Sequence, residues 1–183
     1  MSEDEARLAL RRRLVTERAA LADRAAREHA LRQRVAHWLE HADARAVGFY
    51  WPIRGEPDVR APIGAWLSAD TSRVAALPVI VGSLLQFQAW SPEAPMRAGE
   101  FGIPVPARGR VVQPDCLLIP CLGFDEHKFR LGYGGGFYDR TLAALVPWPL
   151  AVGVAFECGK VPTIDPHAGD MALDTIITDE ATY

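Results

Sequence analysis

The sequence has few cysteines, no long apolar run and no large excess of charge of either sign. Its three cysteines, Cys116, Cys121 and Cys158, show neither paired spacing nor metal-ligand spacing. This favours reduced thiols in the cytoplasm over a disulfide framework. No apolar stretch approaches the roughly 20 residues that span a bilayer. The first residues, MSEDEARLALRRR, carry charges where a signal peptide has its apolar segment. We therefore expect a cytoplasmic protein without a membrane segment.

Charge and size narrow the function classes further. The net charge of −3 and the lack of a basic–aromatic surface pattern give no reason to expect a nucleic-acid partner. The 183 residues fit a single domain over positions 1–183, long enough to bury a two- or three-layer core. We expect small-molecule partners and a monomer.

Helix and strand patterns alternate along the chain. The segment from Asp4 to Glu40 lacks glycine and proline, which predicts one long helix, or two with a break near Ala22–Asp23. The other expected helices are Val59–Ala69 and Gly136–Leu145, and the expected strands are Ala46–Trp51, Arg73–Leu77 (ended by Pro78), Leu84–Trp90, Cys116–Ile119, Leu150–Phe156 and Thr175–Thr178. This alternation predicts an α/β fold, a Rossmann-like three-layer sandwich with a mostly parallel central sheet.

Prolines and glycines concentrate between Ser91 and Pro114, where there are five prolines and three glycines. This composition predicts a long irregular connection. Loops of that length are uncommon in compact domains and are often functional.

The segment Arg130–Asp139, RLGYGGGFYD, is the most informative part of the sequence. It has four glycines in five positions and leads into an expected helix. Glycine lets backbone N–H groups approach an anion, and a helix N-terminus adds unpaired N–H groups and a positive dipole end. A Walker A motif would end in Gly-Lys-Ser/Thr, and a dinucleotide motif would need glycine at Phe137. The segment predicts a phosphate cradle of another type; the alternative is a flexible turn before a helix.

Charged residues near this segment fit a phosphate ligand. Arg130 and Arg140 flank the glycines, and a guanidinium can bind phosphate oxygens with two hydrogen bonds. Asp139 could hold Mg²⁺ against phosphates, with Asp170 or Asp174 as a second carboxylate. The alternative is that these carboxylates are solvated or simply favoured by a helix first turn.

The N-terminal helix carries a second basic element. At 100° per residue, Arg7, Arg11 and Arg18 fall within about 40° of one another around the axis, beside a narrow leucine stripe. This row could reach an adjacent anion site; the alternative is an ordinary solvated face.

Taken in order, the motifs resemble those of the 5-formyltetrahydrofolate cyclo-ligases, also called methenyltetrahydrofolate synthetases. The match is collinear over nearly the whole chain, and its glycine segment is highly specific. The matching segments are Arg7–Arg11, Trp51–Glu56, Phe101–Pro106, Phe124–Asp125, Arg130–Asp139, His167–Asp174 and Thr175–Thr178.

The resemblance implies a fold similar to that of the sugar-phosphate isomerases and CoA-transferases. It also implies ATP-dependent conversion of 5-formyltetrahydrofolate to 5,10-methenyltetrahydrofolate through an iminium phosphate, with release of ADP and phosphate. Two alternatives stay open. One is a sugar-phosphate or acyl-CoA enzyme on the same fold, and the other is a non-catalytic nucleotide-binding or regulatory module.

The resemblance assigns roles residue by residue. The residues implied for ATP are Arg7, Leu8, Ala9, Leu10, Arg11, Arg130, Leu131, Gly132, Tyr133, Gly134, Gly135, Gly136, Phe137 and Tyr138. Those implied for the folate are Trp51, Glu56, Tyr133, Gly134, Gly135, Gly136 and Phe137. Glu56, Arg130 and Tyr138 are the implied catalytic residues, and Asp139 and Asp170 the implied Mg²⁺ ligands.

Three positions depart from the family pattern. The family often has lysine at Arg7, many members have glycine at Lys128, and some have lysine at Gly135. Arg7 keeps the charge but changes the geometry of a phosphate contact. Without the resemblance, Glu56 would equally well be a surface acid, and Trp51 a core residue.

Overall fold

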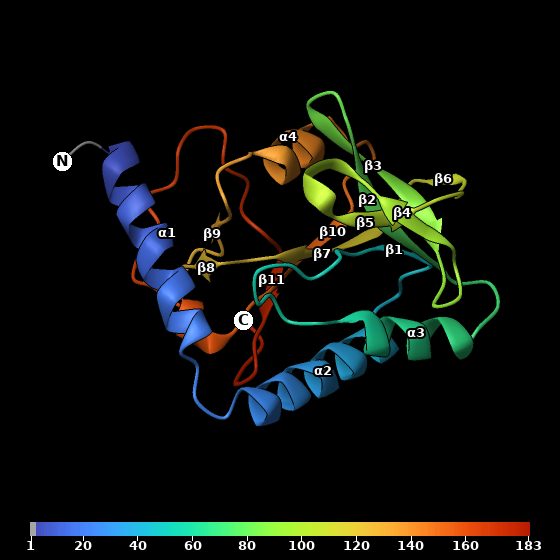
Figure 1. Cartoon of the computed structure of the whole chain (residues 1–183), viewed down its shortest axis with the longest axis horizontal. Coiled ribbons are helices and arrows are strands. Elements are labelled where there is room, and N and C mark those ends of the chain that lie inside the picture. The colour runs from blue at the N-terminus through green and yellow to red at the C-terminus, as the bar shows by residue number, and fades with distance from the viewer. Residues whose placement is uncertain (1–2) are drawn as a thin grey trace.

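The computed structural model describes residues 3–183, and a seven-stranded sheet forms its centre (Figure 1). From edge to edge the strand order is β11-β10-β7-β1-β2-β3-β6. The strands are β1 Ala46–Gly48, β2 Val74–Val81, β3 Leu84–Trp90, β6 Val111–Val112, β7 Cys116–Pro120, β10 Leu150–Val154 and β11 Thr175–Ile177. β11, β10, β7, β1 and β2 run parallel, and β3 is antiparallel to β2 and β6. The predicted α/β fold with a mostly parallel sheet is confirmed.

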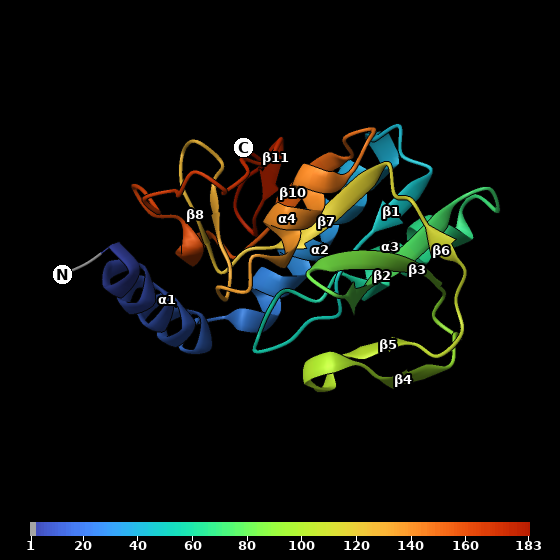
Figure 2. The ribbon, with the colours of Figure 1, turned by 90° about the horizontal axis from the view of Figure 1, so that it is seen from above.

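Helices cover both faces of this sheet (Figures 1 and 2). α2 (Arg24–His41) and α3 (Arg60–Ser68) lie on one face, and α4 (Phe137–Ala144) lies on the other. Side chains alternate between the faces of a strand. Along β7, accordingly, Leu118 packs in the α2 and α3 cluster and Leu117 in the α4 cluster. The two cores produce the predicted three layers.

The first helix stands apart from the sheet. α1 (Glu3–Ala19) ends before α2 begins, with Asp23 in the left-handed region at φ 51°, so the predicted break near Ala22–Asp23 is confirmed. Leu14 on α1 is buried with residues of the hairpin formed by β8 (Gly123–Phe124) and β9 (Arg130–Leu131). The sequence did not predict this hairpin. In the chain it follows β7 and directly precedes the glycine segment Gly132–Gly136. Positions 1 and 2 of the predicted domain lie outside the described residues.

Two predictions about local structure are wrong. β2 continues through Pro78 to Val81 because β1 pairs only with the first residues of β2. Pro78 therefore has a strand neighbour on one side only, where a missing N–H is tolerated. The segment between Ser91 and Pro114 is also more regular than predicted. It contains a hairpin of β4 (Met96–Ala98) and β5 (Pro104–Pro106), with a 3₁₀ turn at Glu100–Gly102, and then β6. Both strands of a two-stranded ribbon are edges, which accept proline.

The remaining short element is a 3₁₀ turn at Glu157–Gly159, which contacts α1. Among the described residues, none of the helices combines the length and apolar character needed to cross a membrane.

Candidate ligand cavity and its family

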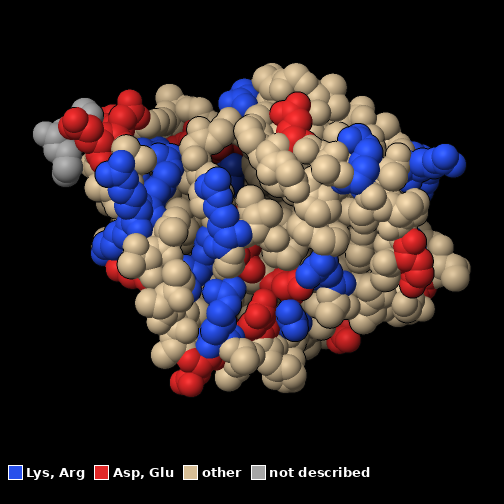
Figure 3. Space-filling model, viewed as in Figure 1, with Lys and Arg blue, Asp and Glu red and all other residues tan. Residues whose placement is uncertain are grey.

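A cavity of about 940 Å³ opens at the carboxyl ends of β1 and β7. Its walls come from α1, the residues after β1, the second half of β2, the β4–β5 hairpin, the glycine loop (Arg130–Asp139) and His167–Asp170. Lys and Arg side chains gather toward the α1 side of the face shown in Figure 3. Open α/β sheets bind ligands at this end of their strands, so the cavity is the candidate functional site.

The glycine loop has the backbone conformation that its composition predicts. Gly134 and Gly136 have φ angles of 93° and 63°, in the left-handed region that favours glycine. α4 begins directly after Gly136, and no side chain of the described residues caps its N-terminus. The first N–H groups of a helix have no partner inside the helix. Because the loop and the first turn of α4 line the cavity, they fit the predicted phosphate cradle better than a plain turn.

Two arginines of α1 form part of the cavity wall. Arg7 and Arg11 lie one turn apart, and both side chains line the cavity. The Nε of Arg11 donates to the Gly132 carbonyl at 2.9 Å, and the Nε of Arg7 is buried without a partner among the described residues. Burial, followed by the charge of Arg7, lowers the pKa of Arg11. Two crowded, partly desolvated guanidinium groups favour an anionic ligand.

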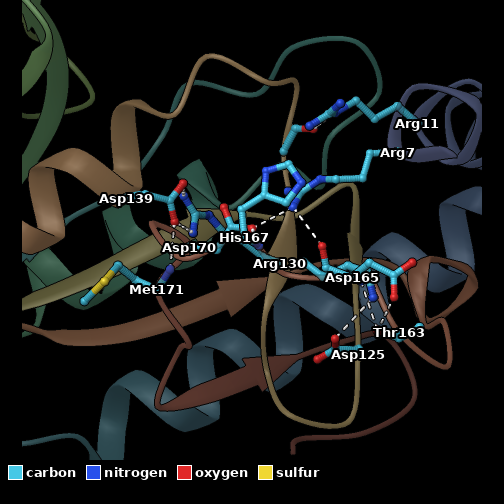
Figure 4. Close-up of polar contacts among 12 residues, drawn as sticks. Arg7, Arg11, Asp125, Arg130, Asp139, Thr163, Asp165, His167, Asp170 and Met171 are labelled. Carbon is cyan, nitrogen blue, oxygen red and sulfur yellow. Dashed lines mark hydrogen bonds and ion pairs between the residues drawn. The ribbon is translucent and has the colours of Figure 1, made fainter. Parts of the chain in front are cut away.

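Each predicted Mg²⁺ ligand is paired with an arginine (Figure 4). Asp139 accepts two hydrogen bonds from Arg130, at 2.8 and 2.9 Å, and one from the backbone N–H of Met171 at 3.1 Å. Asp170 accepts from Arg7 at 2.7 Å and from the backbone N–H of His167 at 2.8 Å. Met171 follows Asp170 in the chain, so the bond from its N–H joins Asp139 to the backbone next to Asp170.

This donor set fits Mg²⁺, which takes one or two protein carboxylates together with phosphate oxygens. Among residues 3–183, the one cluster with three close His, Cys, Asp or Glu ligand atoms is His37, Glu40 and His41. All three are exposed on α2, and none of them lines the cavity.

Four residues predicted to contact ATP do not line the cavity: Leu8, Ala9, Leu10 and Leu131. Leu8 and Ala9 are exposed because the helical repeat turns them away from the face that carries Arg7 and Arg11. Leu131 is fully buried in the cluster around Leu14, with Leu10 packed against it. Any contact of these four with ATP would use their backbone, and it stays a prediction.

Glu56 is the buried acid of the cavity, with 6% of its surface exposed. Its carboxylate accepts a hydrogen bond from the backbone N–H of Ile53 at 2.9 Å. Burial raises the pKa of Glu56 to about 7, against the opposing effects of the Ile53 hydrogen bond and the charges of Arg18 and Arg54. A carboxyl that titrates near neutrality can exchange a proton with a ligand.

Aromatic side chains surround this acid. Tyr138 lines the cavity with its ring 5.7 Å from the Arg130 guanidinium, and burial keeps its pKa well above the ordinary range. Tyr50 is buried and donates to the Pro57 carbonyl at 2.7 Å. Trp51 lines the cavity and has Arg60 over its ring, 4.4 Å from the ring centroid. The cavity thus has an arginine-rich side, formed by the glycine loop and α1, and a more apolar side with one buried acid, Glu56.

Sequence reasoning missed much of the apolar side. The β4–β5 hairpin contributes Phe101, Ile103 and Val105 to the wall, and β2 contributes its residues from Pro78 to Ile80. Phe101 is 81% exposed and has φ 56°. Phe101–Pro106 is one of the segments that match the family pattern. That match was the sequence signal that could have predicted a place for these residues in the cavity wall.

Comparisons with known proteins show which family the chain belongs to. The 5-formyltetrahydrofolate cyclo-ligase family matches residues 3–179. The 5-formyltetrahydrofolate cyclo-ligase of Haemophilus influenzae is 30% identical over 161 residues, which cover 82% of this chain and 84% of that protein. The structure of the Aquifex aeolicus 5,10-methenyltetrahydrofolate synthetase matches with a TM-score of 0.78 and 27% identity, covering 96% of this chain and 91% of that one.

A second solved structure extends the likeness of fold. The Mycoplasma pneumoniae 5,10-methenyltetrahydrofolate synthetase matches with a TM-score of 0.76 and 23% identity, covering 98% of this chain and 99% of that one. Together with the glycine loop, the arginines of α1 and the buried acid, the match over almost the whole chain shows that this protein belongs to the 5-formyltetrahydrofolate cyclo-ligase family.

Proposed function

We propose that this protein converts 5-formyltetrahydrofolate and ATP to 5,10-methenyltetrahydrofolate, ADP and phosphate. One observation carries the proposal: a single cavity joins an anion-binding side, built by the glycine loop and α1, to an apolar side that holds Glu56. ATP would occupy the first side and the folate the second. The family match and the names of the relatives support the same reaction.

The reaction needs positioning more than a protein nucleophile. The formyl oxygen attacks the γ-phosphorus, the bond to the β-phosphate oxygen breaks, and ADP leaves. N10 of the folate then attacks the activated carbon and loses its proton, and the carbon–oxygen bond breaks to release phosphate. Phosphoryl transfer of this kind depends on alignment and on stabilisation of the phosphate charge. We assign these tasks to the glycine loop, Arg7, Arg11 and Arg130.

The carboxylates would hold the metal. Asp139 and Asp170 would bind Mg²⁺, which offsets phosphate charge when bound. Both carboxylates already lie against arginines of the phosphate side. Three arginines, Arg7, Arg11 and Arg130, and the two carboxylates would thus surround the expected position of the triphosphate.

Glu56 and Tyr138 would act on the folate side. With a pKa of about 7, Glu56 is partly ionised at neutral pH, so it can accept a hydrogen bond from the pterin or take up the N10 proton. The hydroxyl of Tyr138, whose pKa is raised, keeps its proton at neutral pH and can donate a hydrogen bond. Trp51 would add an aromatic contact to the folate.

A direct assay tests the proposal. Purified protein is mixed with 5-formyltetrahydrofolate and Mg-ATP, and the methenyl product is followed by its absorbance in the near ultraviolet. We expect product and ADP in equal amounts, and no product when ATP is omitted. ATP binding without product would favour the non-catalytic module. Absence of both binding and product would favour the sugar-phosphate or acyl-CoA alternative.

A further inference from the structure

Arg18 lies behind the cavity wall and contacts two of the segments that form it. It belongs to the last turn of α1, is only 3% exposed and does not line the cavity. Its Nη2 donates to the Arg54 carbonyl at 2.8 Å and also to the Tyr133 hydroxyl. Its Nη1 is buried without a partner among residues 3–183. A guanidinium placed in this way is fixed by the two segments that it joins.

The first of these segments is a turn that requires support. Residues Ile53–Glu56 form a turn closed by a 2.9 Å hydrogen bond from the Glu56 N–H to the Ile53 carbonyl. Both central residues have positive φ, 48° at Arg54 and 77° at Gly55. A residue with a Cβ rarely adopts such a φ unless its surroundings hold it there. Arg18 binds the Arg54 carbonyl, and Arg24 binds the Gly55 carbonyl at 2.8 Å.

The turn determines where the buried acid lies. The Glu56 carboxylate returns to the N–H of Ile53, at the start of the same turn. Any change in the turn would therefore move the carboxylate.

The second segment is the glycine loop. Tyr133 lies between its glycines, and the Arg54 guanidinium stands 4.9 Å from the centroid of its ring. Tyr133 and Glu56 both line the cavity. Arg18 therefore joins the glycine loop, on the proposed phosphate side of the cavity, to the turn that carries Glu56, on the proposed folate side.

We propose that Arg18 is a positioning residue: its Nη2 joins the Tyr133 hydroxyl to the Arg54 carbonyl and so sets the spacing between the glycine loop and Glu56. The inference rests on the proposed function, because spacing affects catalysis only if phosphoryl transfer spans the two sides. Nothing in the reaction requires Arg18 to touch a substrate, and the cavity wall separates it from one.

The charge of Arg18 acts on Glu56 as well. The charged and titratable groups that act on the Glu56 carboxylate are the cations Arg18 and Arg54 and the neutral groups Tyr50, Cys121, Tyr133 and Tyr138. The pKa values of all four neutral groups are raised, with burial as the largest cause, so they carry no charge near pH 7. The charges of Arg18 and Arg54 thus lower the pKa of Glu56, whereas burial raises it.

Two substitutions separate position from charge. Arg18→Lys keeps the charge, but a point charge does not reproduce the planar fork of arginine. We expect kcat/KM to fall about tenfold or more, the effect of losing one charge-assisted hydrogen bond, with little change in its pH dependence. Arg18→Gln also removes the charge, which raises the pKa of Glu56. In a plot of kcat/KM against pH, the rising limb should therefore move to higher pH by about one pH unit. Arg13→Gln, on an exposed part of the same helix, is the matched control and should leave both quantities unchanged.

A second measurement works without turnover. Carbon-13 NMR of glutamate-labelled protein follows the Glu56 carboxyl, identified by its loss in Glu56→Gln. Its titration midpoint should rise in Arg18→Gln and stay near the wild-type value in Arg18→Lys and Arg13→Gln. Wild-type kcat/KM in Arg18→Lys, or an unshifted midpoint in Arg18→Gln, would overturn the inference. A wild-type protein without cyclo-ligase activity would instead reject the proposed function, and the titration would still show whether Arg18 acts on Glu56.

Discussion

At the scale of single residues, burial of Glu56 costs stability and moves the pKa of its carboxyl toward neutrality. Burial raises its pKa from 4.5 to about 7, so between these values the folded protein binds a proton that the unfolded chain has released. Stability therefore falls as pH rises through this window, because the folded state must ionise a buried carboxyl. A residue selected only for stability at this position would be neutral.

Replacing this acid with its amide should show both effects. Glu56→Gln keeps an oxygen that can accept the Ile53 hydrogen bond but removes the titration. Cyclo-ligase kcat/KM should fall at neutral pH. The gain in the free energy of unfolding over wild type should be about 2.5 kcal/mol larger at pH 8 than at pH 5, from the pKa difference and the linkage relation. Urea unfolding at the two pH values measures this gain, and an equal gain at both would show that Glu56 titrates normally.

At the scale of elements, the glycine loop combines glycines of positive φ with a proposed ligand contact, and Gly82 offers a control. Gly134→Ala would place a side chain at φ 93° and bring its Cβ to 3.6 Å from the Arg11 guanidinium carbon. Gly82→Ala, in the turn between β2 and β3, meets a similar penalty at φ 62°, and no atom of residues 3–183 outside the local chain lies within 4 Å of the new Cβ. Each should cost about 1–2 kcal/mol of stability.

Only the first substitution should disturb the proposed phosphate site. We expect Gly134→Ala to raise the KM for ATP severalfold while the KM for 5-formyltetrahydrofolate changes less, and Gly82→Ala to leave both near wild type. Steady-state kinetics of the two variants measures the KM values, and thermal unfolding measures the loss of stability. Equal KM values for ATP in both would mean that the loop conformation near Gly134 has no part in binding the nucleotide.

The elements also show how far a sequence predicts this structure. The glycine loop, the start of α4 and the break between α1 and α2 follow from local preferences of glycine and of helix formers, and all are present. β2 passing through Pro78 depends on which of its sides has a neighbour. The β4–β5 hairpin is stabilised by its packing on the sheet. Both depend on tertiary contacts that local patterns do not contain.

At the scale of the whole molecule, the cavity gathers segments that are far apart in the chain. Arg7 of α1 bonds to the Asp165 carbonyl and to Asp170, and Arg11 bonds to Gly132. Sequence analysis found these arginines as a row on one helix face. It did not place Arg18 against Tyr133 and Arg54, because that contact depends on how α1 docks beside the β8–β9 hairpin. The proposed phosphate side is therefore a wall that several distant segments build together.

Binding of each ligand should protect the segments of one cavity wall together from amide hydrogen exchange. Mg-ATP should slow amide hydrogen exchange together in α1, in the glycine loop with the start of α4, and in residues 165–171, because arginine contacts join these three segments. 5-Formyltetrahydrofolate should instead slow exchange in residues 50–56 and in the β4–β5 hairpin. At a hundredfold excess over its Kd, each ligand should add about 2.7 kcal/mol to the free energy of unfolding. Exchange in α3, which does not line the cavity, serves as the internal reference. Protection by Mg-ATP confined to the glycine loop would mean that α1 takes no part in the nucleotide site.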